Sequence, residues 1–264
     1  MRFKSNGILQ GAKGGLFLRG HFEASFMQTS HPLLRAEGIY KHYGHIEVLR
    51  NLHFSLTERE IVSVVGPSGA GKSTMLHILG AIDRPDRGRV WYREHALETL
   101  SERQLAEFRN RHMGFVFQFH HLLPEFSALE NVLMPALIGR RSEKEARNLG
   151  RDLLHLLGLS HREHHRPNQL SGGEQQRIAV ARALINRPGV VLADEPSGNL
   201  DSQSSEHLHG LFFQIRDEFG TAFLIVTHNP GLADMADRKV TMQDGRLLDD
   251  THAPTGPSPN VQPS

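Results

Sequence analysis

The sequence predicts an α/β fold whose core is a mixed β-sheet. Short apolar runs typical of buried strands alternate with segments that have the helical period. A glycine-rich loop separates one of these runs from a helical segment, and two later runs end in polar residues that do not belong in a core. With 264 residues the chain can bury a substantial core, either as one α/β domain or as a core domain that carries a smaller lobe.

The two ends of the chain are expected to lie outside the ordered domain, which we place at residues 33–250. Residues 1–32 contain a short apolar piece but no secretion-signal pattern. We interpret them as a disordered extension or an artefact of gene prediction, with translation starting at Met27. Residues 251–264 are rich in proline and hydroxyl residues, and this composition predicts a disordered tail.

The first ordered elements are predicted to be antiparallel strands. Residues 33–39 and 49–56 alternate partly between apolar and polar side chains, which is typical of strands with one buried face. The next apolar run, residues 61–65, does not alternate. It indicates a strand that is buried on both faces.

The loop after this strand fits a phosphate-binding pattern, in which two glycines five residues apart precede a lysine and a hydroxyl residue. Glycines allow backbone N–H groups to point inward at an anion, and the following helix adds its positive dipole end. Lys72 supplies a charge for the outer phosphates, and Ser73 offers its hydroxyl to Mg²⁺. The loop therefore predicts binding of a nucleoside triphosphate through Gly66, Pro67, Ser68, Gly69, Ala70, Gly71, Lys72, Ser73 and Thr74.

Three later segments are predicted to be helices. The first opens with a capping box at residues 142–145 and continues with an apolar face to Leu157. The second opens with a capping box at residues 171–174 and stops before Pro188. The third carries apolar residues from 208 to 219 and stops at Gly220.

Two apolar runs end in candidate catalytic residues. Residues 190–193 lead into Asp194 and Glu195, and residues 222–226 lead into Thr227 and His228. In an open parallel sheet, ligands bind beyond the carboxyl ends of the strands. We therefore expect Asp194 to hold Mg²⁺, Glu195 to polarise the water that attacks the γ-phosphate, and His228 to reach the same phosphate.

The composition argues against several other classes of protein. Thirty basic and 29 acidic residues nearly cancel, and no basic block is long enough to indicate a nucleic-acid tract. There is no cysteine, so the chain has no disulfide or thiolate metal site. No apolar stretch approaches the length that spans a bilayer. We expect a chain that does not bind nucleic acid and reaches a membrane only through a partner.

The ordered set of motifs resembles the ATP-binding cassette (ABC) ATPases over about residues 33–248. The residues that carry this resemblance are Tyr43, the loop from Gly66 to Ser73, Gln118, Leu170 with Ser171, Gly172, Gly173 and Glu174, then Asp194, Glu195, Asp201 and His228. The resemblance implies a phosphate-loop NTPase of ABC type, with an antiparallel β subdomain and an α-helical subdomain inserted at about 101–180. It also implies a homodimer in which ATP lies between the phosphate loop of one copy and Ser171, Gly172 and Gly173 of the other.

The resemblance assigns roles to the remaining residues. Tyr43 is expected to stack on the adenine, with Tyr40 as an alternative. Gln118 is expected to contact the Mg²⁺ or the attacking water and to link the two lobes, so that Ser73, Gln118 and Asp194 form the predicted metal set. Asp201 is expected at the dimer seam. The start of a helix at Ser171 offers a second anion site, which fits a nucleotide shared between two copies.

The segment after Gln118 is similar to ATPases of lipoprotein-releasing transporters. Residues 119–139 are rich in Leu, Phe and Met but contain Pro124 and Pro135, so we do not expect one regular core helix there. An apolar, irregular surface suits docking of a partner's short helix. The similarity implies two permease partners of the LolC and LolE kind, a peripheral location on the cytoplasmic face of the inner membrane, and a role in releasing lipoproteins toward the outer membrane.

Several alternatives remain open at this point. A related ATPase of a macrolide exporter or of the FtsE type has a similar sequence. A non-transport ABC ATPase that acts on DNA or ribosomes is less well supported, because the chain has a single cassette and no cysteine. The histidine-rich stretch 161–166 is interpreted as a solvated loop rather than a metal site.

Overall fold

The computed structural model describes residues 32–252 of the chain. Residues 1–31 of the predicted N-terminal extension and residues 253–264 of the predicted tail lie outside the described residues. One boundary differs from the prediction, because the last strand continues through His252. Its pairing extends two residues into the predicted tail, where Thr251 and His252 oppose Lys239 and Arg238.

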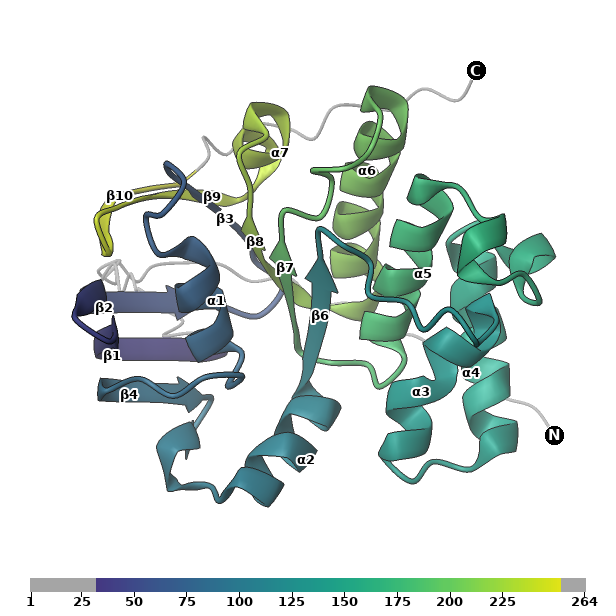
Figure 1. Cartoon of the computed structure of the whole chain (residues 1–264), viewed down its shortest axis with the longest axis horizontal. Helices are drawn as coiled ribbons and strands as arrows, with labels where there is room; N and C mark the ends of the chain where they lie inside the picture. The colour runs from purple at the N-terminus through teal and green to yellow at the C-terminus, as the bar shows by residue number, and fades with distance from the viewer. Residues whose placement is uncertain (1–31, 253–264) are drawn as a thin grey trace, which may run out of the picture. The chain divides into compact units, whose positions relative to one another are not determined.

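The larger sheet consists of β3 (Ile61–Val65), β6 (Met113–Phe117), β7 (Val190–Asp194), β8 (Ala222–Val226), β9 (Arg238–Gln243) and β10 (Arg246–His252). The strand order is β10-β9-β3-β8-β7-β6. Neighbours from β9 to β6 are parallel, and β10 is antiparallel to β9 (Figure 1). The predicted mixed sheet is therefore confirmed.

The smaller sheet is antiparallel and has the order β2-β1-β4-β5. Its strands are β1 (Leu34–Tyr43), β2 (Ile46–Leu56), β4 (Arg87–Tyr92) and β5 (His95–Ala96). The first two were predicted as shorter strands. Register shifts along β1 interrupt the alternation of buried and exposed side chains, and this hides the full strand length in the sequence.

The helices are α1 (Lys72–Leu79), α2 (Glu102–His112), α3 (Ala128–Ile138), α4 (Glu143–Leu156), α5 (Gly172–Leu184), α6 (Ser202–Phe219) and α7 (Pro230–Met235). Short 3-10 turns are at Leu97–Thr99, Ser160–Arg162 and Pro167–Gln169. α1 packs between the larger sheet and the smaller one, whereas α3, α4 and α5 pack together on the far side of β6 (Figure 1). Among residues 32–252, no helix is both long and apolar enough to cross a membrane.

The three predicted helices are confirmed as α4, α5 and α6, but one cap differs. Ser142 caps α4 by accepting from the Glu145 N–H, as predicted. The reciprocal half of the predicted capping box is not formed, because the Glu145 carboxylate accepts a hydrogen bond from Arg141 instead. The box at the start of α5 has both halves.

Pro135 was expected to interrupt a helix in this apolar segment, but it does not. It lies inside α3, which begins at a capping box formed by Ser127 and Glu130. Leu129 and Val132 are buried in the core on either side of Asn131, which is itself buried and hydrogen-bonded. Tertiary packing therefore holds α3 helical through the proline. The residues before it, 119–126, are irregular as predicted.

The larger sheet separates two hydrophobic cores. Successive residues of β7 alternate between them, so that Val190 and Leu192 face one core and Val191 and Ala193 face the other. The first core also contains α1 and the smaller sheet, and the second contains the buried faces of α3 to α6. Both faces of the central strands are covered, which fixes their carboxyl ends in place.

Candidate nucleotide-binding site

The carboxyl ends of four parallel strands bring the predicted phosphate-binding and catalytic residues to one edge of the larger sheet. β3 leads into Gly66, and β6 leads into Gln118. β7 ends at Asp194, which is in register with Phe117 of β6 and Val226 of β8. This edge is the one at which open α/β sheets bind ligands.

The loop between β3 and α1 requires glycine at two positions because neighbouring strands approach it closely. A Cβ at Gly66 would overlap the carbonyl oxygen of Met242 on β9. Gly71 has φ 102°, and a Cβ there would lie 3.0 Å from the Val48 carbonyl oxygen and from side-chain atoms of Leu49 and Met242. The loop is therefore held tightly against β2 and β9, with its backbone fixed beneath the site.

Lys72 is the first residue of α1, and its side chain folds back over the loop. Its Nζ donates to the carbonyl oxygens of Gly66 at 2.8 Å and Pro67 at 2.9 Å. The positive charge is thus held at the mouth of the loop, where the N-terminal end of α1 adds its own positive dipole. This arrangement suits a ligand that carries several negative charges.

Glu195 and His228 contact each other at the ends of β7 and β8. Glu195 Oε2 accepts from the His228 backbone N–H at 3.1 Å and lies 2.8 Å from His228 Nδ1. Glu195 has φ 47°, an uncommon backbone conformation for a residue with a side chain, and its N–H bonds to the Val226 carbonyl at 2.9 Å. The backbone conformation and these bonds fix the direction of the carboxylate.

Gln118 follows β6 and contacts a residue that the sequence analysis did not single out. Gln118 Nε2 donates to Asn199 Oδ1 at 3.1 Å, and Asn199 Nδ2 donates to the Gln118 carbonyl at 3.3 Å. Asn199 lies in the segment between Glu195 and Asp201. The pair joins the loop after β6 to the loop after β7 across the sheet edge.

These residues line one pocket of about 590 Å³. Its volume lies in the usual range for small-molecule sites, which is about 300–1,000 Å³. The pocket is lined by Val48, Gly66, Ser68, Gly69, Gly71, Lys72, Ser73, Thr74, Gln118, Asp194, Glu195, Val226 and His228. Pro67 and Ala70 belong to the loop but do not line the pocket. Ala70 is buried beneath it, and its carbonyl accepts from the Gly245 N–H.

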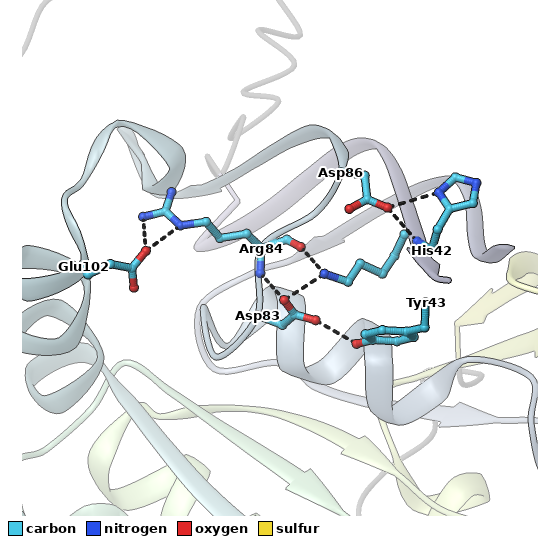
Figure 2. A network of polar contacts seen from close by, with 7 residues as sticks. His42, Tyr43, Asp83, Arg84, Asp86 and Glu102 are labelled. Atoms are coloured by element: carbon cyan, nitrogen blue, oxygen red, sulfur yellow. Dashed lines mark hydrogen bonds and ion pairs between the residues drawn. The ribbon is translucent and has the colours of Figure 1, made fainter. Parts of the chain in front are cut away.

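Tyr43 lies beside the pocket at the end of β1, with 49% of its surface exposed. Its hydroxyl donates to Asp83 Oδ2 at 2.7 Å (Figure 2). This hydrogen bond and burial raise the pKa of Tyr43, while the side chain of Thr74, which lines the pocket, opposes the shift. Tyr40, the alternative, is half-buried and paired with Arg87 of β4.

The predicted trans-acting segment forms the start of α5 and does not line the pocket. Ser171 and Glu174 cap the helix reciprocally, and Arg162 donates to the Glu174 carboxylate at 2.8 Å. Gly172 is exposed, whereas Gly173 is buried. Within the described chain, the helix start and the phosphate-type loop are therefore two separate candidate anion sites.

Asp201 is the N-cap of α6. Its carboxylate accepts from the Ser204 N–H at 2.8 Å and from the Ser204 hydroxyl at 2.7 Å. These bonds, the backbone one foremost, lower the pKa of Asp201. Ser204 also packs against Gly173, where a Cβ would lie 3.0 Å from the Ser204 hydroxyl oxygen. Asp201 is thus held next to the exposed start of α5.

Two further residues of α5 support the loop that carries Gln118. Gln176 is buried and donates to the Phe117 carbonyl at 3.2 Å. Arg182 donates to the carbonyls of His120 at 2.8 Å and His121 at 2.7 Å. The sequence offered one signal for these residues, namely polar side chains on the buried side of a predicted helix. Their partners lie about 60 residues away in the chain, and the sequence does not identify them.

Comparisons with known proteins agree with this geometry. The pattern of the ABC transporter family matches residues 49–198. The lipoprotein-releasing system ATP-binding protein LolD of Cytophaga hutchinsonii is 58% identical over 216 residues, which is 82% of this chain and 99% of that protein. LolD of Bacteroides thetaiotaomicron is 52% identical over 218 residues, which is 83% of this chain and 100% of that protein.

Two solved structures have the same fold over the cassette. A dimeric post-hydrolysis ATP-binding cassette bound to ADP and Pi matches with a TM-score of 0.78 and 36% identity, covering 84% of this chain and 100% of that chain. A dimeric bacterial ABC transporter cassette matches with a TM-score of 0.78 and 37% identity over the same shares.

Proposed function

This chain belongs to the ABC transporter family, and we propose that it is the ATP-hydrolysing subunit of an inner-membrane complex that releases lipoproteins toward the outer membrane. The observation that carries the proposal is the single pocket that gathers Lys72, Gln118, Asp194, Glu195 and His228. The lipoprotein-releasing relatives, at 52–58% identity over nearly their whole length, supply the substrate class.

The pocket supports ATP hydrolysis by positioning and charge stabilisation. The phosphate loop and Lys72 grip the outer phosphates, and Glu195 orients and polarises the attacking water. His228 Nδ1 lies 2.8 Å from Glu195 Oε2 and so helps to fix the carboxylate. We propose that His228 also contacts the γ-phosphate. Because the reaction adds charge to oxygens in this pocket, fixed donors lower its barrier.

The donors in the pocket fit a magnesium ion bound together with the nucleotide. Ser73, Gln118 and Asp194 all line it and would supply hydroxyl, amide and carboxylate oxygens. Mg²⁺ prefers oxygen ligands and is usually held by few protein groups, with phosphates and waters completing its shell. When bound, the ion neutralises charge on the phosphates.

The proposed assembly is a homodimer with ATP at the interface. Both solved relatives are described as dimers. The phosphate loop of one copy and the exposed start of α5 at Ser171 and Gly172 of the other then bind opposite sides of the same triphosphate. Asp201, beside the start of α5, lies at the seam. Cleavage of the γ-phosphate removes charge that both copies grip, so the dimer opens.

We further propose that an apolar groove between α2 and α3 receives a short cytoplasmic helix of each permease partner. The groove has a volume of about 370 Å³ and is lined by residues of α2, β6, α3 and α5. Ile138 lines the groove with 67% of its surface exposed. Phe119, two residues after the lining residue Phe117, is 66% exposed. Arg182 lines the groove and also holds the loop after Gln118. Arg182 therefore links the proposed docking surface to the loop that carries Gln118. Docking to the permeases would hold the chain on the cytoplasmic face of the inner membrane.

The mostly helical segment 101–180 is proposed as the subdomain that carries this docking surface. It contains α2, α3, α4 and the start of α5, but also β6, which pairs with β7 in the larger sheet. The helices that pack on one another are α3, α4 and α5. We therefore propose that the helical subdomain proper begins after β6.

Purification of the tagged chain from detergent-solubilised membranes tests this function. We expect it to carry two permease subunits, and the reconstituted complex should release a lipoprotein from liposomes when ATP is added. The complex that contains Glu195→Gln should assemble but release nothing. Co-purification with exporter or cell-division proteins, without lipoprotein release, would instead favour the macrolide-exporter or FtsE-type alternative.

A further inference from the structure

A network of polar contacts fixes Tyr43 although half of its surface is exposed (Figure 2). An exposed tyrosine ordinarily samples several rotamers, and a ligand that stacks on it must overcome that freedom. Here the hydroxyl donates to Asp83 Oδ2 at 2.7 Å. A hydrogen bond to a carboxylate is stronger than one between neutral groups, so it holds the far end of the ring.

Asp83 is itself held from two further sides. Lys41 Nζ donates to Asp83 Oδ1 at 2.8 Å, and the Arg84 backbone N–H donates to the same oxygen at 2.7 Å. Lys41 is only 8% exposed, and its Nζ also donates to the Arg84 carbonyl at 2.7 Å. Burial alone would raise the pKa of Asp83, but the hydrogen bonds from Lys41 and Tyr43 outweigh it and lower that pKa. The ionised form of the carboxylate is therefore favoured, and both of its oxygens accept hydrogen bonds.

In the same network, the Lys41 side chain covers one face of the Tyr43 ring. Lys41 Nζ lies over the Tyr43 ring, 5.2 Å from its centroid. A cation over one face is attracted by the ring and occupies that face. The opposite face of the ring is then left for a stacking partner, and the Tyr43 hydroxyl interacts with the side chain of Thr74, a pocket residue of α1.

We propose that Asp83 is a positioning residue for nucleotide binding, which holds the Tyr43 ring ready to stack on the base. Asp83 follows α1 closely, so the same helix carries the phosphate grip at its start and the base platform just beyond its end. The inference rests on the proposed function, because it requires that Tyr43 is the residue on which the base stacks.

Two probes separate the base from the phosphates. Isothermal titration of the full chain with a non-hydrolysable ATP analogue measures both contributions, and titration with inorganic tripolyphosphate measures the phosphate contribution alone. We expect Asp83→Ala to weaken the ATP analogue about fivefold to tenfold, in the range of a lost stacking contact. Binding of tripolyphosphate should be unchanged. Equal loss for both probes would overturn the inference, since Asp83 would then act on the phosphate loop or on folding.

Variants of Tyr43 distinguish a failure of this inference from a loss of stability and from a failure of the proposed function. Tyr43→Phe retains the ring and leaves Lys41 paired with Asp83, so it removes only the hydrogen bond under test. We expect it to weaken the analogue less than Tyr43→Ala does, and to add no further loss in an Asp83→Ala background. Additive losses would overturn the inference. If Tyr43→Ala itself binds normally, the assignment of the base site under the proposed function is wrong.

Glu102→Ala provides a matched control. Glu102 accepts from the Arg84 side chain at 2.8 Å at the outer end of the same network, but it does not contact Asp83 or Tyr43 (Figure 2). Its removal should leave both affinities unchanged. A loss comparable to that of Asp83→Ala would show that the whole loop, and not the Asp83 contact, sets the affinity, and it would contradict the inference.

Discussion

At the scale of single residues, the proposed site combines groups that bind the nucleotide with one carboxylate that activates water. In the proposed mechanism, Lys72 and the loop glycines bind the phosphates, whereas the Glu195 carboxylate polarises the attacking water. The left-handed backbone of Glu195, with φ 47°, and its contact with His228 fix the direction of the carboxylate. Binding and chemistry are therefore separable by substitution.

Replacement of Glu195 by Gln is expected to abolish turnover without loss of ATP affinity. The amide keeps the size of the side chain but no longer polarises water as a base, which is worth about 10²–10⁴-fold in rate. Phosphate release and nucleotide titration measure the two effects. Glu218→Gln, an exposed position near the end of α6, serves as the control and should behave as wild type. Undiminished turnover in the Glu195 variant would refute its assignment.

Gly66→Ala is expected to destabilise the fold rather than only the site. The added Cβ meets the Met242 carbonyl on β9, so the loop or the strand must move. We expect a loss of about 3 kcal/mol or more in the free energy of unfolding, measured with denaturant. Gly210→Ala is a matched control, because this helical position has open space around it and alanine favours helix by about 1 kcal/mol. Similar stabilities for the two variants would contradict the steric account.

At the scale of elements, sequence patterns identified the helices that have a clear apolar periodicity and a cap, and the glycine-rich loop. The phosphate loop, α4, α5 and α6 were found because glycine spacing, caps and apolar faces mark them. α2 was not found, because it is very polar and buries only Leu105. α3 was misjudged because packing around Asn131 overrides the effect of Pro135.

The candidate site was predictable where its residues follow strand ends, and not where it depends on long-range contacts. Asp194, Glu195 and His228 lie at or just after the ends of apolar runs. This position marks them as candidate site residues in the sequence alone. Asp83 and Asn199 act through partners 40 and 81 residues away. A single sequence does not specify such pairings, since polar residues in loops are common and their contacts arise only in the folded chain.

The α6 helix carries a buried histidine that makes stability depend on pH. His209 is 5% exposed, its Nε2 lies 3.1 Å from the Ser197 hydroxyl, and burial lowers its pKa although Glu206 opposes the shift. The neutral ring is therefore favoured in the folded state. Its contribution to stability is fully present above the unfolded pKa, about 6.5, and is lost as pH falls below that value.

We expect His209→Gln to flatten the loss of unfolding free energy between pH 7.5 and 5.5. The wild type can lose up to about 1.4 kcal/mol per pH unit through one such site. Some slope remains in the variant, because burial also lowers the pKa values of His112 and His120. Denaturant titrations at several pH values give the slopes, with the exposed His207→Gln as the control. An identical slope in the His209 variant and the wild type would contradict this account.

At the scale of the whole molecule, the two candidate anion sites and the proposed docking groove are linked through α5. Its start is exposed at Gly172, and its later residues Gln176 and Arg182 hold the backbone on both sides of Gln118. In the proposed complex, α5 therefore connects the docking groove to the loop that carries Gln118. We propose this connection as the route by which a membrane partner acts on ATP hydrolysis.

Ile138→Glu is expected to separate docking from catalysis. It places a charge at the rim of the groove between α2 and α3, where a partner's apolar helix would have to bury it. Recovery of the permeases with the tagged chain should fall at least about tenfold. ATP binding by the isolated chain should not change. Lys144→Glu, on the exposed surface of α4, is the control, and normal recovery with Ile138→Glu would show that the groove is not the docking surface.

The mass of the Glu195→Gln variant in solution, measured by light scattering with and without ATP, tests the shared nucleotide most directly. We predict that ATP doubles the mass and that each dimer retains two nucleotides, while a double variant that also carries Lys72→Ala stays monomeric. A Glu195→Gln chain that binds ATP tightly and remains a monomer at every concentration would contradict the account.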